Sequence, residues 1–134
     1  ARITRILDDI PDATTRCGTI LSLLLGFAEK NPGLARVLGG DVLTGETARL
    51  RQRVHQLFER LETQLKQVLR EAELREGWRT SITASAAANL LIAQAEGRIS
   101  QYVRSDFKRL PTEYWEDQWT LLSGQLFRNA SQPA

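Results

Sequence analysis

His55 and Cys17 are the residues of this sequence whose chemistry suits acid–base or nucleophilic catalysis. His55 precedes Glu59 by one helical turn, a spacing that would allow an imidazole–carboxylate pair. Cys17 follows Arg16, and an adjacent cation favours a reactive thiolate. No nucleophile accompanies His55, however, and a packed thiol is the usual state of a single cysteine. We therefore interpret His55 as a surface residue and Cys17 as a core residue, and we predict that the chain is not an enzyme.

The segment from Gly40 to Thr47 has the spacing of a phosphate-binding loop, G-x-x-x-x-G-K-[ST], except that Glu46 stands at the lysine position. A carboxylate repels phosphate, and no strand is predicted before the segment. We interpret it as a helix stop followed by Thr44, which caps the next helix. One histidine and one cysteine also leave no Cys/His-rich zinc site within the chain, so no metal or cofactor is expected.

The run LLLGFAEKNP, residues 23–32, is the remaining constellation with a possible binding role. Gly26 weakens a helix by about 1 kcal/mol relative to alanine, so its place in a strongly apolar run needs an explanation. Either a neighbouring helix packs close to it, or it forms the floor of a shallow apolar groove. In the second case Lys30 and Arg2 supply charge at the rim, and the groove suits a short peptide with apolar anchors.

Helical periodicity accounts for nearly the whole chain, and we predict six helices and no strand. The first has one apolar face and ends before Pro11, and Asp12 is expected to cap the second. The later helices are expected at about 12–30, 32–38, 46–75, 81–107 and 112–127. The longest carries a single-sided apolar stripe, formed by Leu50, Val54, Leu57, Phe58, Leu61, Leu65, Val68 and Leu69. Its opposite face mixes both signs of charge and is interpreted as solvated.

The last two helices carry features that indicate self-association. Residues 81–107 are rich in alanine and glycine, and small side chains let helices approach closely, within a chain or across a dimer axis. Trp115 and Trp119 lie one turn apart on the last helix, which needs a substantial surface to bury them. Thr112 is expected to cap that helix. Glu96 and Arg98 lie among the small residues and are expected in an ion pair or hydrogen-bond pair at the interface, with contact to a ligand as the alternative.

Length and charge set limits on the class of protein. The chain has 134 residues and a net charge of +2, from 18 basic and 16 acidic side chains. It suits one domain and creates no strong electrostatic field for nucleic acid, despite a pI of about 9.0. The most apolar stretch, residues 20–28, is too short to span a bilayer. Because the chain opens inside a helical pattern without an initiator methionine, we expect it to be part of a longer protein.

Three long segments, LLLGFAEKNPGLARVL, VHQLFERLETQLKQVLRE and AEGRISQYVRSDFKRLPTEYWEDQW, closely resemble the C-terminal domain of the nucleoid occlusion factors of the TetR family. The resemblance extends from Arg2 to about Gln125. It implies an all-α domain that forms a homodimer through its last two helices, with a helix-turn-helix DNA-binding domain absent from this chain. It also implies a cytoplasmic, nucleoid-associated regulator of cell division that binds the tail of the tubulin-like GTPase FtsZ and antagonises its assembly over the chromosome.

The resemblance implies positions for both interaction sites. The FtsZ tail is expected to contact Arg2, Leu23, Gly26, Lys30 and Asn31, and the apolar pattern adds Ile3, Ile6 and Phe27. Lys30 replaces an arginine of the family pattern, which keeps the charge but loses fork-like pairing with a carboxylate. The dimer interface is expected to include Ala88, Leu91, Ala95, Arg98, Trp115, Trp119, Leu122 and Leu126. The alternative function is a ligand-sensing domain of a TetR-type repressor, with a small apolar effector inside the bundle.

Overall fold

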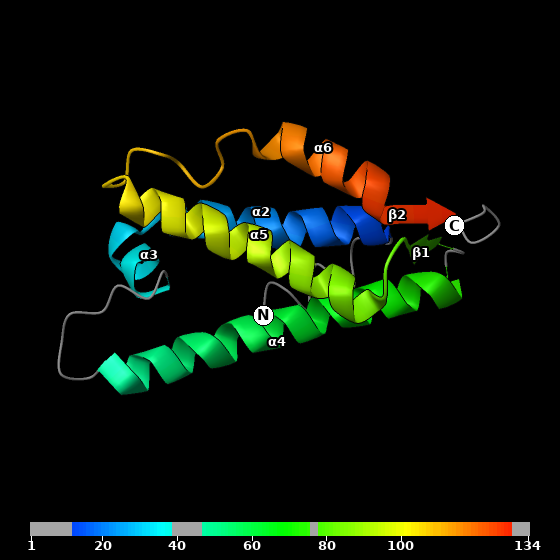
Figure 1. Ribbon diagram of the computed structural model, residues 1–134, viewed down its shortest axis with the longest axis horizontal. Helices are drawn as coiled ribbons and strands as arrows, with labels where there is room; N and C mark the ends of the chain where they lie inside the picture. Colours follow the sequence, from blue (N-terminus) through cyan, green and yellow to red (C-terminus); the bar gives the residue numbers. More distant parts are fainter. Residues whose placement is uncertain (1–11, 39–46, 76–77, 130–134) are drawn as a thin grey trace.

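The computed structural model describes residues 12–38, 47–75 and 78–129, which form a bundle of helices with one small sheet (Figure 1). The helices are α2 (Ala13–Lys30), α3 (Pro32–Leu38), α4 (Thr47–Arg75), α5 (Ala84–Arg104) and α6 (Trp115–Leu126). The strands are β1 (Trp78–Thr80) and β2 (Phe127–Asn129). The all-α class is confirmed. The first predicted helix, and most of the segment that resembles a phosphate-binding loop, lie outside the described residues.

The two-stranded sheet corrects the prediction that the chain has no strand. β1 and β2 pair antiparallel, with Arg79 opposite Arg128. Beside them the N–H of Ser81 donates to the carbonyl of Leu126 at 2.8 Å, which ties the end of α6 to the entry of α5. Each strand has three residues, and the partners are far apart in sequence. Local periodicity carries no signal for so short and distant a pairing.

Both boundaries predicted around α2 are confirmed. The Asp12 carboxylate caps the helix, because its Oδ2 accepts from the N–H of Thr15 at 2.9 Å. Asn31 ends α2, and Pro32 is the first residue of α3, where its missing N–H removes no helical hydrogen bond.

The starts of α5 and α6 differ from the predicted residues because of the hydrogen bonds that two threonine side chains make. α5 begins at Ala84 rather than near Ser81, since the Thr83 hydroxyl accepts from the N–H three residues on at 3.1 Å. α6 begins at Trp115, and Thr112 does not cap it. The Thr112 hydroxyl donates instead to a carboxylate of α2.

The hydrophobic core lies between α2, α4 and α5. Its fully buried side chains include Leu21 and Leu25 of α2, Leu65 and Leu69 of α4, and Leu91 and Ile99 of α5. The predicted stripe of α4 is confirmed from Phe58 to Leu69. Its first turns are less covered: Leu57 is 38% exposed, and Leu50 and Val54 are half-buried. None of the described helices is both long and apolar enough to cross a membrane.

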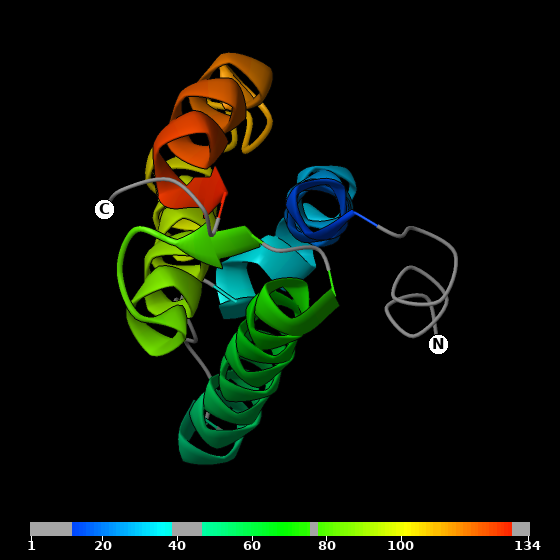
Figure 2. The same ribbon diagram turned by 90° about the vertical axis from the view of Figure 1, so that its right-hand side faces the viewer.

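Helix α6 packs on α2 through its two tryptophans. In Figure 2, α6 lies above α5 at the left, α2 lies at the right, and α4 lies at the bottom. The indole N–H of Trp115 donates to the Ser22 hydroxyl at 3.0 Å, and the Trp115 and Trp119 rings stack 5.7 Å apart. A β-carbon added at Gly18 would lie 2.6 Å from Trp119 Nε1. The close approach of the two helices therefore requires glycine at this position.

Candidate functional site

One face of α2 is exposed although its residues are apolar. Leu23 is 36% exposed and Phe27, one turn later, is 54% exposed, and Gly26 lies beside them on the helix. A β-carbon added at Gly26 would meet no described atom within 4 Å. None of the described helices therefore packs close to Gly26, and the first predicted helix lies outside the described residues. We call Leu23, Gly26 and Phe27 the apolar face of α2.

A cation and a capped helix end border the apolar face. Lys30 is exposed in the last turn of α2. The side-chain N–H of Asn31 donates to the carbonyl of Phe27 at 2.8 Å, and its backbone N–H donates to the carbonyl of Ala28 at 3.2 Å. Asn31 thus closes the helix that presents Lys30. Its side chain keeps one N–H and the amide oxygen for other contacts.

Three further polar groups fix the same end of α2. The carbonyl of Glu29 accepts from the Tyr102 hydroxyl of α5 at 2.8 Å, and its carboxylate accepts from the Thr112 hydroxyl at 2.5 Å. Sequence reasoning missed the contacts of Glu29 with Tyr102 and Thr112, because partners 73 and 83 residues away leave no local signal. Arg2, Ile3 and Ile6, the other residues predicted for this site, lie outside the described residues.

Most residues predicted for the dimer interface are buried within one chain. Ala88, Leu91 and Ala95 are 0% exposed in the core, and Trp115 and Leu126 are also buried. The buried alanines of α5 therefore serve close helix packing inside the chain, whereas Ala86, Ala93 and Gly97 of the same helix are exposed. Trp119 and Leu122 are half-buried.

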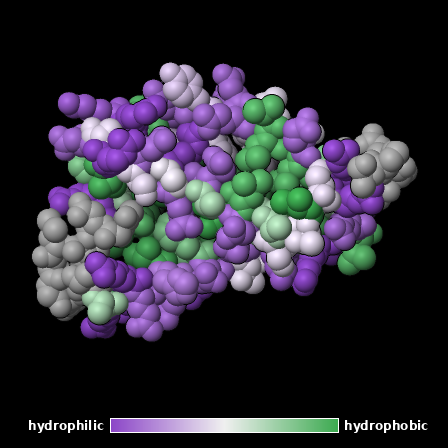
Figure 3. Space-filling model, viewed as in Figure 1, coloured by the Kyte–Doolittle hydropathy of each residue, from purple (hydrophilic) through white to green (hydrophobic). Residues whose placement is uncertain are grey.

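A different set of α5 and α6 residues is open to the surface. Figure 3 shows a hydrophobic band that runs between these two helices. Leu121 is 71% exposed, and it borders a groove of about 460 Å³. The groove is lined by Gln94, Trp115, Gln118, Leu121, Leu122 and Gln125. Sequence reasoning missed Leu121 because it falls outside the stripe that contains both tryptophans.

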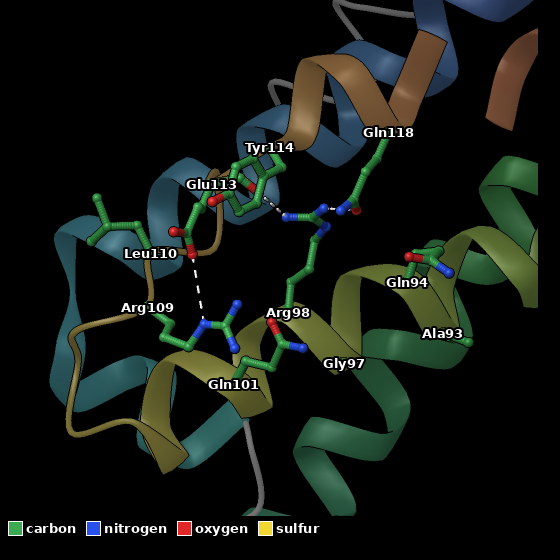
Figure 4. A pocket seen from close by; sticks show the side chains of 10 residues that line it. All are labelled: Ala93, Gln94, Gly97, Arg98, Gln101, Arg109, Leu110, Glu113, Tyr114 and Gln118. Atoms are coloured by element: carbon green, nitrogen blue, oxygen red, sulfur yellow. Dashed lines mark hydrogen bonds and ion pairs between the residues drawn. The ribbon is translucent and has the colours of Figure 1, made fainter. Parts of the chain in front are cut away.

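Arg98 is buried between α5 and the segment that leads to α6 (Figure 4). One of its terminal nitrogens donates to the carbonyls of Pro111 and Glu113 at 2.8 and 2.7 Å, and the other donates to the Gln118 side chain. The guanidinium also lies 5.1 Å from the Trp115 ring centre. Burial lowers the pKa of Arg98, and the nearby Glu113 carboxylate opposes that shift. Arg98 therefore makes its hydrogen bonds within the chain and to neutral acceptors, rather than across an interface as predicted.

Glu96 is exposed rather than paired with Arg98, and it lines a cleft of about 290 Å³ between α4 and α5. Burial raises the pKa of Glu96, and the charges of Glu62 and Glu59 add to the shift. His55 is exposed at the same cleft, as predicted for a surface histidine. In the described residues, no group of three or more His, Cys, Asp or Glu side chains could hold a metal ion.

Cys17 is fully buried, which confirms the prediction of a packed thiol. The neighbouring Arg16 is directed to the Glu71 carboxylate of α4, 3.8 Å away. No catalytic role is assigned to either residue.

Comparison with known proteins places this arrangement in a family. The SlmA-like family of tetracyclin repressor-like C-terminal domains matches residues 11–127. The chain is 54% identical over 129 residues to the nucleoid occlusion factor SlmA of Shewanella amazonensis, and 52% identical to that of Shewanella frigidimarina. Each match covers 96% of this chain and 66% of the relative, slightly less than two thirds of its length. The chain therefore belongs to the SlmA-like family of tetracyclin repressor-like C-terminal domains.

Proposed function

We propose that the chain is the C-terminal domain of a nucleoid occlusion factor and that it binds the C-terminal tail of FtsZ. The observation that carries the proposal is the 54% identity to a nucleoid occlusion factor over 96% of the chain. In this role the domain is a non-enzymatic, nucleoid-associated regulator of division. DNA is bound by a helix-turn-helix domain in another part of the protein.

The apolar face of α2 supports a peptide partner. Leu23 and Phe27 lie one helical turn apart and expose hydrocarbon beside Gly26, where no described atom fills the space. An apolar side chain of the FtsZ tail fits over the glycine, and a carboxylate of the tail pairs with the exposed Lys30 ammonium. Binding is expected to be weak, because the footprint is small and a disordered tail loses conformational entropy on docking.

A labelled FtsZ tail peptide tests this site by fluorescence anisotropy. Lys30→Glu reverses the charge at the rim, and Gly26→Glu fills the open floor with a charged side chain, so both variants are expected to abolish binding. Arg60→Glu is the matched control, because Arg60 is exposed on α4 and the substitution makes the same charge change. Unchanged affinity in both site variants would refute the assignment, and no binding by the wild type would refute the function.

We also propose that the chain forms a homodimer through the open surfaces of α5 and α6. An exposed Leu121 beside a groove with half-buried Leu122 is the kind of apolar surface that a second copy covers. Leu121→Glu is expected to give a monomer in sedimentation, because a charge is then desolvated at the interface. Leu74→Glu is the control, since Leu74 is 88% exposed on α4. A Leu121→Glu protein that remains dimeric contradicts the proposed surface.

The effector-binding alternative receives less support from the packing. The core side chains Leu21, Leu25, Leu65 and Leu91 are fully buried. The cleft beside Glu96 and His55 opens to solvent and has charged walls, which does not suit a small apolar effector. We therefore favour the peptide-binding function.

A further inference from the structure

The segment that joins α5 to α6, residues 105–114, has a defined backbone conformation. It turns away from α5 through Asp106 and Phe107, whose φ angles are 57° and 64°, so α5 ends before the predicted residue 107. The N–H of Phe107 donates to the carbonyl of Tyr102 at 2.7 Å, and their rings meet edge to face at 5.1 Å. The Ser105 hydroxyl accepts from the N–H of Arg109 at 2.8 Å. We call this segment the α5–α6 connection.

Arg98 of α5 holds the part of the connection that immediately precedes α6. Its guanidinium donates to the carbonyls of Pro111 and Glu113, which flank Thr112. Pro111 is fully buried, and the N–H of Trp115 donates to the carbonyl of Thr112 at 3.0 Å. These hydrogen bonds fix the backbone on both sides of Thr112 and thereby position its hydroxyl next to the Glu29 carboxylate.

Glu29 receives two hydrogen bonds in the last turn of α2, where carbonyls have no helical partners. Tyr102, which is 3% exposed, donates to its carbonyl, and Thr112 donates to its carboxylate. Successive residues of a helix differ by about 100° in direction. The bond to Thr112 therefore holds the Glu29 carboxylate on the α6 side of the helix, away from the direction in which Lys30 projects.

We propose that Glu29, held by Tyr102 and Thr112, is a positioning residue for the tail-binding site. The inference rests on the proposed function, since it assumes that Lys30 binds the FtsZ tail and that these three residues keep its ammonium group available. When the carboxylate is held by Thr112, the Lys30 ammonium is the charge that a carboxylate of the peptide meets. When the carboxylate is released, it competes for Lys30 and repels the peptide. The α5–α6 connection thus sets the electrostatics of a site on another helix.

The test measures affinity for the labelled FtsZ tail peptide in Thr112→Val and Tyr102→Phe. Each substitution removes one hydroxyl and keeps nearly the same shape. Thr112→Val releases the Glu29 carboxylate and is expected to weaken binding about three- to tenfold, the effect of one hydrogen bond. Tyr102→Phe removes only the bond to the backbone carbonyl of Glu29, so it is expected to weaken binding less than Thr112→Val does. Thr112→Ser restores the hydroxyl and is expected to restore affinity. Thr63→Val is the matched control, because the Thr63 hydroxyl donates within α4 to the carbonyl of Glu59 at 2.9 Å.

A double-mutant cycle with Lys30→Ala separates positioning from a loss of stability. If Thr112 acts through Lys30, adding Thr112→Val to Lys30→Ala changes affinity less than it does in the wild type. The melting temperature and sedimentation of each variant are measured alongside. Wild-type affinity in Thr112→Val, or an equal loss in the presence and absence of Lys30, overturns the inference while the proposed function stands. No binding by the wild type overturns both.

Discussion

Gly18 and Gly26 lie about two turns apart on α2, and replacing each by alanine is expected to change stability in opposite directions. In a helix interior, alanine is favoured over glycine by about 1 kcal/mol. A β-carbon at Gly26 would meet no described atom within 4 Å, so nothing opposes that gain. Gly26→Ala is therefore expected to raise the free energy of unfolding by about 1 kcal/mol.

At Gly18 the same substitution meets the Trp119 indole. The added β-carbon would lie 2.6 Å from Nε1 and 2.9 Å from Cε2, whereas ordinary contacts begin at 3.4 Å. The ring must move, which also loosens its stacking on Trp115. Overpacking of this kind costs about 1–3 kcal/mol, against the helical gain of about 1 kcal/mol. Gly18→Ala is expected to be less stable than Gly26→Ala by about 1–3 kcal/mol.

Urea unfolding followed by tryptophan fluorescence measures both variants. All samples need the same protein concentration, because dimerisation contributes to the apparent stability. A Gly18→Ala protein as stable as Gly26→Ala would show that Trp119 does not rest on Gly18. That result would refute the docking of α6 on α2 described above.

Three other substitutions test separate parts of the structure. Arg98→Met is expected to lower the free energy of unfolding by about 2–4 kcal/mol in urea titrations, because two carbonyls of the α5–α6 connection lose their donor. Asp12→Ala removes the cap that receives the N–H of Thr15 and is expected to cost about 1 kcal/mol in the same assay. Glu96 has a raised pKa in the folded state, so wild-type stability is lost as pH rises through that pKa. Because glutamine does not ionise, Glu96→Gln does not suffer this loss. The variant should therefore melt at a higher temperature than the wild type at neutral pH, and the difference should vanish below the ordinary pKa of a glutamate.

The residues that the sequence placed correctly are those whose signals are local. The Asp12 cap, the break at Asn31 and Pro32, and the stripe of α4 from Phe58 to Leu69 all follow from spacings within one helix. Thr112 was assigned a local role, as a helix cap, and its hydroxyl bonds to a residue 83 positions away. A capping residue and a long-range donor look the same in sequence, because both are hydroxyl side chains near a helix start.

The same distinction separates the two glycines of α2. The sequence marks Gly26 as unusual and leaves two explanations open, and in the described structure no helix packs close to it. Gly18 was not singled out, yet it is the glycine on which another helix packs. Whether another helix packs closely against a glycine depends on the tertiary arrangement of the helices, which the local sequence does not show.

By itself, the sequence determined the helical class, most helix boundaries, the core face of α4 and the family resemblance, because each depends on short-range spacing or on long matched segments. Only the tertiary structure decided which apolar residues remain exposed. Leu91 and Leu121 are both leucines on the last two helices, but one is 0% exposed and the other 71%. It also decided that Glu29 is held by two distant hydroxyls. The physical reason is that burial and hydrogen-bond partners are set by how the helices pack together, which local periodicity does not encode.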